Sequence, residues 1–437
     1  MGSSLGAQTG KCALRNRLGP GISVQPGRSN FVFDCRLSCG KCGVMRLLDG
    51  SAFFRVLLTV SMVLGGCAYD SKNGEGQKRK SEVDRATEIL ERIREQYAPD
   101  PHLAVFDVGI ESRGTELRIA GEVSEAKAKT AILREFGNGR WKIRDEIKLL
   151  PDPALGDQTW GVVSLSVANG REKPDHKAEM GTQGLMGQTV RILKLNRRWL
   201  YVQTADRYLS WMESGAVTRC TAEQAETWNS SSRLIVTNYE ECVREQPRAE
   251  AQPVSDLVMG NLVKQLGQEN GWIHVELPDG RRGFLAKSAA EDYEAWKRSR
   301  QPTAEHIERT ARLLLGRPYL WGGNSSKAAD CSGFCKLVFF LNGIDLNRNA
   351  SEQALQGEEV AIDQDFSKPR KGDLLFFGWR GRGADSAWVT HVAIYLGDKR
   401  FIQSSERVRI SSLDPKSPDF DSFHTRSLVF ARRILKE

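Results

Sequence analysis

An internal repeat constrains this chain more than any other feature, because two segments align without gaps at an offset of 73 residues. The matched positions are Gly187 and Gly260, Trp199 and Trp272, Val202 and Val275, Asp206 and Asp279, Trp211 and Phe284, and Ala216 and Ala289. Each copy runs from a glycine through short apolar strands and a polar turn to a strand that ends near an aromatic residue. This pattern predicts two small β-barrels, with Trp199 and Trp272 in their cores.

Both copies resemble bacterial SH3-like domains, and we assign them to residues 151–222 and 228–292. The resemblance implies that they hold cell-wall peptide or line the cleft of a partner enzyme. Residues 81–150 come before them and show a helical period, two alternating strands, a second helix and a third strand. We expect a small α+β module there, faintly similar to a BON-type domain, with no chemistry of its own.

The segment from Arg317 to Phe340 carries the chemistry. The glycine-rich turn 322–324 leads to Asp330-Cys331-Ser332-Gly333, and a helical run comes after it. Cys331 is therefore expected at a helix N-terminus, where unpaired N–H groups and the helix dipole favour the thiolate. Such a thiol needs a histidine to protonate the leaving amine.

His391 is the best placed of the six histidines, because it alone opens an alternating strand, at 391–397. A turn at Gly397 and Asp398 leads into a second strand, and this hairpin can bring Gln403 beside His391. The remaining histidines lack a partner motif and are expected to be structural or exposed: His102, His176, His274, His306 and His424. Cys335 is expected to be a buried helix thiol.

Four motifs in this order resemble an NlpC-type (NlpC/p60) cysteine peptidase domain over residues 300–437. They are Tyr319–Gly323, Asp330–Phe334, Lys371–Phe377 and His391–Tyr395. The resemblance implies a papain-like α+β fold with Cys331 as nucleophile and His391 as general base and acid. The third polar residue, usually histidine, falls on Gln403, whose amide oxygen can orient the imidazole but adds no charge.

Two SH3-like domains before such a peptidase resemble the γ-D-glutamyl-L-diamino acid endopeptidases of murein peptide recycling. The resemblance implies that the first SH3-like domain caps the cleft and binds the free amine of a terminal L-Ala through Glu179 and Tyr208. Glu179 as a solvated turn carboxylate is the alternative. The residues that would line the catalytic side are Tyr319, Trp321, Asp330 and Ser332.

The apolar run Val56–Gly66 is shorter than the roughly 20 residues of a membrane-spanning helix. It fits a signal peptide, and Leu64–Cys67 resembles a bacterial lipobox. We predict a lipoprotein signal at 45–66, lipidation of Cys67 and a tether at 67–80. A non-lipidated signal with an incidental cysteine is the alternative. Residues 1–44 are interpreted as an untranslated segment before a start at Met45.

The net charge of +8 is concentrated in the leader, where eight basic and two acidic residues precede Cys67. The remainder is close to neutral, which argues against a nucleic-acid partner. The four cysteines beyond Cys67 are too few for a disulfide framework. No metal or organic cofactor is implied.

The sequence thus predicts a monomeric α+β multidomain protein, exported and attached to a membrane through its lipid. Its partners are peptidoglycan stem peptides, in which it cleaves the bond between γ-D-Glu and diaminopimelate or lysine. Two alternatives stay open at this point: a non-catalytic wall-binding lipoprotein, and an amidase or acyltransferase on the same scaffold.

Overall fold

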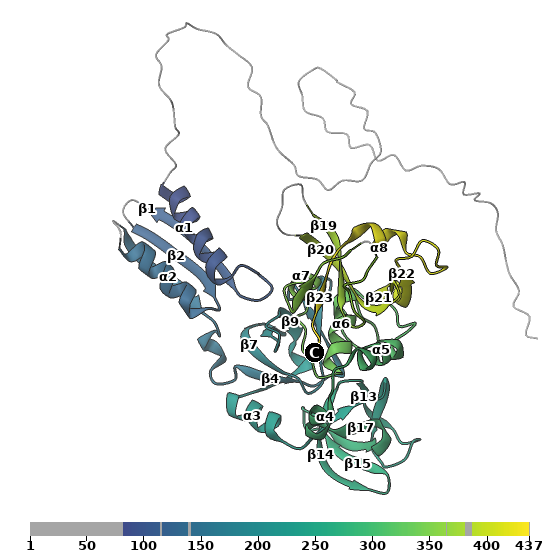
Figure 1. Ribbon diagram of the computed structural model, residues 1–437. Helices are drawn as coiled ribbons and strands as arrows, with labels where there is room; N and C mark the ends of the chain where they lie inside the picture. The colour runs from purple at the N-terminus through teal and green to yellow at the C-terminus, as the bar shows by residue number, and fades with distance from the viewer. Residues whose placement is uncertain (1–81, 114–115, 139–140, 364, 381–386, 437) are drawn as a thin grey trace, which may run out of the picture. The chain divides into compact units, whose positions relative to one another are not determined.

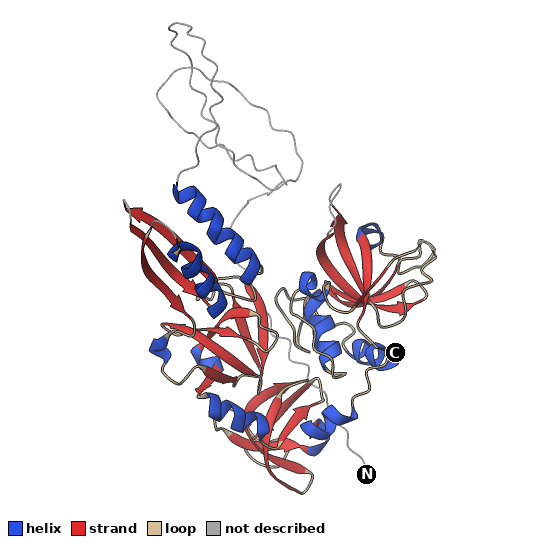
Figure 2. Cartoon of the chain, turned by 60° about the vertical axis from the view of Figure 1, so that its left-hand side comes forward, coloured by secondary structure: helices blue, strands red, loops and turns tan. Residues whose placement is uncertain are grey.

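The computed structural model describes residues 82–113, 116–138, 141–363, 365–380 and 387–436. The predicted signal peptide, Cys67 and the tether lie outside these residues. The described chain forms four β-sheets in succession along the sequence, each accompanied by helices (Figures 1 and 2). The prediction of an α+β multidomain fold is therefore confirmed. None of the described helices has the length and apolar character needed to cross a membrane.

The N-terminal module has the predicted order of elements. They are α1 (Glu82–Tyr97), β1 (Phe106–Arg113), β2 (Glu116–Val123), α2 (Ala126–Gly137) and β3 (Lys142–Leu149). β1 is antiparallel to β2, whereas β3 is parallel to β2, because α2 carries the chain back across the sheet. Leu90 of α1 and Ile132 of α2 share one hydrophobic core with Ile119 of β2. Both helices therefore cover the same face of the sheet (Figure 2).

The repeat forms two seven-stranded sheets with the same strand order. The first contains β4 (Trp160–Val163), β5 (Val167–Arg171), β6 (Met180–Leu185), β7 (Thr189–Asn196), β8 (Trp199–Gln203), β9 (Leu209–Glu213) and β10 (Val217–Cys220). The second contains β11 (Arg233–Val236), β12 (Glu240–Arg244), β13 (Pro253–Val258), β14 (Leu262–Glu269), β15 (Trp272–Glu276), β16 (Arg282–Ala286) and β17 (Ala290–Asp292). Every strand of the second sheet begins 73 residues after its counterpart, so the repeat seen in the sequence is a repeat of structure.

Two glycines and two tryptophans of the repeat show how it is built. Gly187 and Gly260 adopt φ values of +85° and +90° in the turns before β7 and β14. Glycine is favoured there because a side chain strains such a backbone. Trp199 is buried, as expected for barrel core, whereas Trp272 is only half-buried.

Two short helices flank the second seven-stranded sheet in the sequence. α3 (Ala222–Ser230) lies between the two sheets, and α4 (Tyr293–Ser299) lies between the second sheet and the C-terminal region. Thr221 begins α3 with a capping box, in which its side chain and that of Gln224 each accept a hydrogen bond from the other residue's backbone N–H.

The C-terminal region contains a six-stranded sheet with its helices. Its elements are α5 (Ala304–Leu313), α6 (Cys331–Phe340), α7 (Ala350–Gln353), β18 (Glu358–Val360), β19 (Leu374–Arg380), β20 (Ala387–Gly397), β21 (Arg400–Ser405), β22 (Arg407–Ser412), α8 (Ser422–Ser427) and β23 (Leu428–Arg433). The strands lie in the order β18-β23-β19-β20-β21-β22. Apolar residues are continuous along β19 because Phe376 packs in one core with Phe334 of α6, while Phe377 belongs to another core.

Candidate active site

Cys331 is the first residue of α6, as the sequence predicts, and it is buried. Asp330 caps the helix, because its carboxylate accepts a hydrogen bond of 2.7 Å from the N–H of Gly333. The other carboxylate oxygen accepts a hydrogen bond of 2.9 Å from the N–H of Gly322. A side chain at Gly333 would overlap the carbonyl oxygen of Gly323. The glycine-rich turn is therefore held tightly against the helix start, and this fixes the position of the thiol.

The β20–β21 hairpin supplies the two other predicted catalytic residues. Nε2 of His391 lies 2.7 Å from Oε1 of Gln403, whose side chain is fully buried. The strand begins at Ala387, so the expectation that His391 opens it is wrong, and the histidine lies inside β20. The backbone of Val392, the next residue, lies close enough to the Cys331 sulfur to lower the pKa of the thiol. The hairpin therefore brings the three predicted residues into one neighbourhood.

Burial determines the charge of this pair. Burial, with a smaller contribution from Asp330, raises the pKa of the Cys331 thiol to about 12, although the backbones of Val392 and Ser332 act to lower it. Burial and the neighbouring His424 lower the pKa of His391 to about 3. Both shifts favour the neutral thiol and the neutral imidazole. Burial therefore opposes the thiolate that the helix N-terminus is expected to favour, and that expectation stays a prediction.

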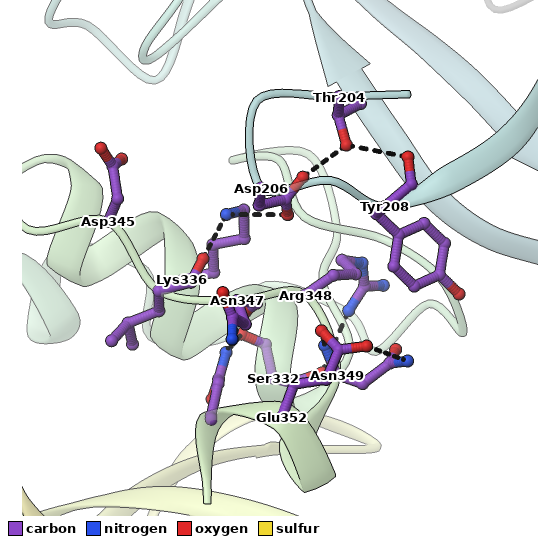
Figure 3. A network of polar contacts seen from close by, with 12 residues as sticks. Thr204, Asp206, Tyr208, Ser332, Lys336, Asp345, Asn347, Arg348, Asn349 and Glu352 are labelled. Carbon is purple, nitrogen blue, oxygen red and sulfur yellow. Dashed lines mark hydrogen bonds and ion pairs between the residues drawn. The ribbon is translucent and has the colours of Figure 1, made fainter. Parts of the chain in front are cut away.

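Arg348 is a buried charge beside the nucleophile that no sequence motif singles out. Its guanidinium binds Asp330 through two nitrogens, at 3.1 and 2.5 Å. It also donates to the Ser332 hydroxyl at 3.0 Å (Figure 3). Its side chain is 1% exposed, and its Nε has no hydrogen-bond partner. Asp330 and Ser332, both predicted to line the site, are thus held by an arginine from the segment before α7.

His424 is a second residue that sequence reasoning missed. Its ring centroid lies 4.5 Å from that of His391, and its Nδ1 lies 2.8 Å from Oδ2 of Asp421. The sequence indicated only a structural or exposed residue, because no motif surrounds it. It is in fact buried directly beside the predicted catalytic histidine.

The first seven-stranded sheet contacts the C-terminal region beside the turn at Gly322. Asn324 donates its backbone N–H to Oε1 of Gln183 at 3.1 Å, and a side chain at Gly322 would overlap the carbonyl of Met180. Lys336 of α6 pairs with Asp206 at 3.1 Å, in a position that leaves both side chains less than one-fifth exposed (Figure 3). These contacts pack the first seven-stranded sheet against the turn and the helix that position Cys331.

The two residues predicted to bind an amine have different surroundings. Tyr208 is buried, which raises the pKa of its phenol to about 12, and Asn349 of the C-terminal region lies near the phenol and opposes this shift. Its ring stacks on His102 of the N-terminal module with centroids 5.5 Å apart. Glu179 is exposed, and among the described residues no side-chain hydrogen bond or ion pair holds it. The structure thus joins Tyr208 to the catalytic region and leaves Glu179 at the surface.

The remaining predicted residues flank the thiol. Tyr319 is half-buried, and burial raises its pKa, with a further contribution from Cys331 and Asp330. Trp321 is 60% exposed, so its indole is available to a ligand. Cys335 is fully buried one turn along α6, as expected.

Two other features were considered as binding sites. In the described part of the chain, Asp100, His102 and Glu352 bring ligand atoms within 4.8 Å of one another. Glu352 already accepts hydrogen bonds from Asn349, so we assign no metal to them. A cavity of about 450 Å³ lies between both seven-stranded sheets and α6, but its lining does not include Cys331, His391 or Gln403. Because this cavity is not lined by the predicted catalytic residues, we place the candidate site at Cys331, His391 and Gln403 instead.

Comparisons with known proteins agree with this geometry. Dipeptidyl-peptidase 6 of Lysinibacillus sphaericus is 29% identical over 274 residues, which cover 59% of this chain and 93% of the relative. The γ-D-glutamyl-L-lysine dipeptidyl-peptidase of Bacillus cereus is 28% identical, covering 54% of this chain and 71% of the relative. Its namesake from Bacillus subtilis is 35% identical, covering 39% of this chain and 53% of the relative.

A solved structure supports the fold. The crystal structure of an NlpC/P60 family protein from Bacillus cereus superposes with a TM-score of 0.54 at 23% identity, covering 63% of this chain and 100% of that one. Residues 170–217 match the bacterial dipeptidyl-peptidase Sh3 domain, and residues 316–426 match the NlpC/P60 family. The C-terminal region of this chain is therefore an NlpC/P60 cysteine peptidase domain, preceded by an SH3 domain of the bacterial dipeptidyl-peptidase type.

Proposed function

We propose that this protein is a thiol endopeptidase that cleaves the bond between γ-D-Glu and the diamino acid of peptidoglycan stem peptides with a free N-terminal L-Ala. The observation that carries the proposal is Cys331 at the start of α6, beside His391 whose Nε2 is bonded to Gln403. The relatives named as γ-D-glutamyl-L-lysine dipeptidyl-peptidases supply the substrate class.

The chemistry begins from the neutral pair. Because Nε2 of His391 faces Gln403, Nδ1 is left to take the thiol proton as the Cys331 sulfur attacks the γ-carbonyl carbon. The backbone N–H of Cys331, the first residue of α6, has no partner within the helix and can stabilise the oxyanion. The imidazolium then gives its proton to the leaving amine, and a thioester remains. Water attacks the thioester, its proton passes to His391, and the peptide carboxylate leaves as the thiol is restored.

We assign the free amine of the substrate to the end of the site closed by the first SH3-type sheet. Tyr208 is the supporting residue, because it is buried between that sheet and Asn349. An acylated amine would lose its charge and its donors in this enclosed place, which disfavours capped peptides. Glu179 stays a prediction as the carboxylate partner of the amine.

The test uses residues 68–437 and the peptide L-Ala-γ-D-Glu-diaminopimelate, with its lysine analogue, each with and without an N-acetyl cap. We expect release of L-Ala-D-Glu from the uncapped peptides, loss of at least about 10⁴-fold in kcat for Cys331→Ala, and activity retained in Cys335→Ala. Cys335 is the matched control, because it is a buried thiol on the same helix. Cleavage of capped peptides at the same rate would contradict the amine assignment, and cleavage by Cys331→Ala would contradict the mechanism.

The proposal also includes the fold of the C-terminal region, the second barrel, the domain boundaries and the attachment of the protein to a membrane. We take the C-terminal region as papain-like, the second seven-stranded sheet as a second SH3-like barrel, and the domain boundaries as those predicted from the sequence. We further propose export and lipid anchoring at Cys67, supported by the apolar run before it. Metabolic labelling with an alkyne fatty acid should tag the full chain and leave Cys67→Ser untagged; equal labelling would refute the anchor.

A further inference from the structure

The amide of Gln403 is held at both ends. Its Oε1 lies 2.7 Å from Nε2 of His391, while its Nε2 donates to Oδ2 of Asp421 and to the hydroxyl of Ser411, each at 3.0 Å. An amide has an accepting end and a donating end, and an ionised carboxylate only accepts. Asp421 therefore determines which end of the Gln403 amide faces His391.

The orientation of the amide determines the tautomer of the histidine. Oε1 of Gln403 can only accept, so Nε2 of neutral His391 must carry the hydrogen. Nδ1 then has its lone pair free, which is the state a general base requires. If the amide turned over, its NH₂ group would donate to Nε2 and would move the imidazole hydrogen to Nδ1. That tautomer cannot accept the thiol proton at Nδ1.

The surroundings keep Asp421 ionised and fixed. It is buried, and it caps α8 through a hydrogen bond of 3.1 Å from the N–H of His424. Its Oδ2 also lies 2.8 Å from Nδ1 of His424 and 3.4 Å from a guanidinium nitrogen of Arg409 on β22. Burial raises the pKa of Asp421, but the hydrogen bonds from His424 outweigh it and lower the pKa overall. Asp330 and Asp421 are the carboxylates that act on His391, and both favour its charged form.

We infer that Asp421 is a positioning residue of the peptidase: by accepting from Gln403, it selects the Nε2–H tautomer of His391 and so leaves Nδ1 free as the base. The inference rests on the proposed function for its catalytic consequence. Its structural consequence, the tautomer, can be measured without any substrate.

The first test is Asp421→Asn, which keeps the size of the side chain and the oxygen that caps α8. The new amide can donate to Oε1 of Gln403, so the Gln403 amide is free to turn over. We expect kcat to fall by at least about tenfold with little change in KM, and the ¹⁵N signals of His391 to change from the Nε2–H to the Nδ1–H pattern. Asp419→Asn is the matched control, because Asp419 is an exposed carboxylate that pairs with Arg400.

A double-mutant cycle separates this role from a general effect on the fold. If Asp421 acts through Gln403, then Asp421→Asn should change kcat less than about twofold in a Gln403→Ala background. Equal losses in both backgrounds would overturn the inference, as would a wild-type tautomer in the single variant. Should Asp421→Asn fail to fold, Asp421→Ser serves in its place, because serine also caps helices but is too short to reach Gln403.

Alkylation of Cys331 by iodoacetamide distinguishes failure of the inference from failure of the proposed function. It reports on the thiol and its base without a peptide. An altered alkylation rate and tautomer in Asp421→Asn, with no peptide cleaved by the wild type, would leave the inference standing and remove the proposed substrate. Cleavage by the wild type with unchanged kcat and tautomer in the variant would do the reverse.

Discussion

At the scale of single residues, burial has the largest effect on the ionisation of the proposed catalytic pair, Cys331 and His391. Cys331 has a raised pKa and His391 a lowered one, and both shifts have burial as their largest cause. A neutral pair avoids the desolvation cost of two buried charges. In the proposed mechanism, the proton therefore passes from Cys331 to His391 only when a substrate carbonyl is present to accept the sulfur.

This neutrality predicts the pH dependence of cleavage. Because the pKa of His391 is lowered to about 3, the imidazole stays unprotonated as the pH falls, and kcat/KM should be nearly constant from pH 8 down to about 5. A preformed thiolate–imidazolium pair would instead give an acid limb set by the thiol. Rates of cleavage from pH 4 to 9 check this. A fall of more than about tenfold in kcat/KM between pH 8 and pH 5 would contradict it.

The limits of sequence reasoning are also clearest at this scale. Cys331 and Gln403 could be placed from local patterns, since one opens a helix and the other comes after a hairpin turn. His424 and Arg348 could not, because each reaches the site from a distant segment with no motif around it. The burial that raises the pKa of Cys331 could not be predicted either, because burial is a property of the packed chain and not of a helix N-terminus.

At the scale of elements, α6 serves the chemistry and the assembly of the domains at once. Cys331 begins the helix at the site, while Lys336 projects from its side and pairs with Asp206 of the turn between β8 and β9 (Figure 3). Lys336 also donates to the carbonyl oxygen of Leu346. Despite the opposing effect of burial, Lys336 and Thr204 lower the pKa of Asp206.

Replacing Lys336 by methionine should therefore destabilise the protein by about 3 kcal/mol, because it leaves the Asp206 carboxylate buried without its partner. Lys327→Met is the matched control. Lys327 also joins the catalytic region to a seven-stranded sheet, through Asp256, but both side chains are about half exposed. Losing this exposed ion pair should lower the free energy of unfolding by less than about 1 kcal/mol. Urea unfolding of the two variants measures the difference, and equal losses would contradict the argument.

At the scale of the whole molecule, the N-terminal module is attached to the first seven-stranded sheet. The carbonyls of His102 and Leu103 accept hydrogen bonds of 2.7 and 2.9 Å from Leu209 and Gln203. Lys194 pairs with Glu122 of β2. The sequence predicted the elements of this module but not its attachment, because its contacts join segments about 100 residues apart.

The stack of His102 on Tyr208 gives the module a measurable effect on the proposed reaction. His102→Ala should free the Tyr208 ring and raise KM for the uncapped peptide about three- to tenfold, as expected for loss of an aromatic contact, with kcat nearly unchanged. His306→Ala is the control, because His306 is a half-buried residue of α5 whose ring bonds to the carbonyl oxygen of Gln301. An unchanged KM in His102→Ala would show that the module does not act on the site.

The offset of 73 residues between the two seven-stranded sheets implies an ancestral tandem duplication whose copies have since diverged. The matched position shows how. Tyr208 of the first copy lies near Asn349 of the C-terminal region, whereas its counterpart Arg281 pairs with Asp279 and donates to the carbonyl oxygen of Ser164 in the first copy. At this position the first copy therefore contacts the C-terminal region, and the second copy contacts the first. Exchanging the order of the two copies along the chain would remove both sets of contacts.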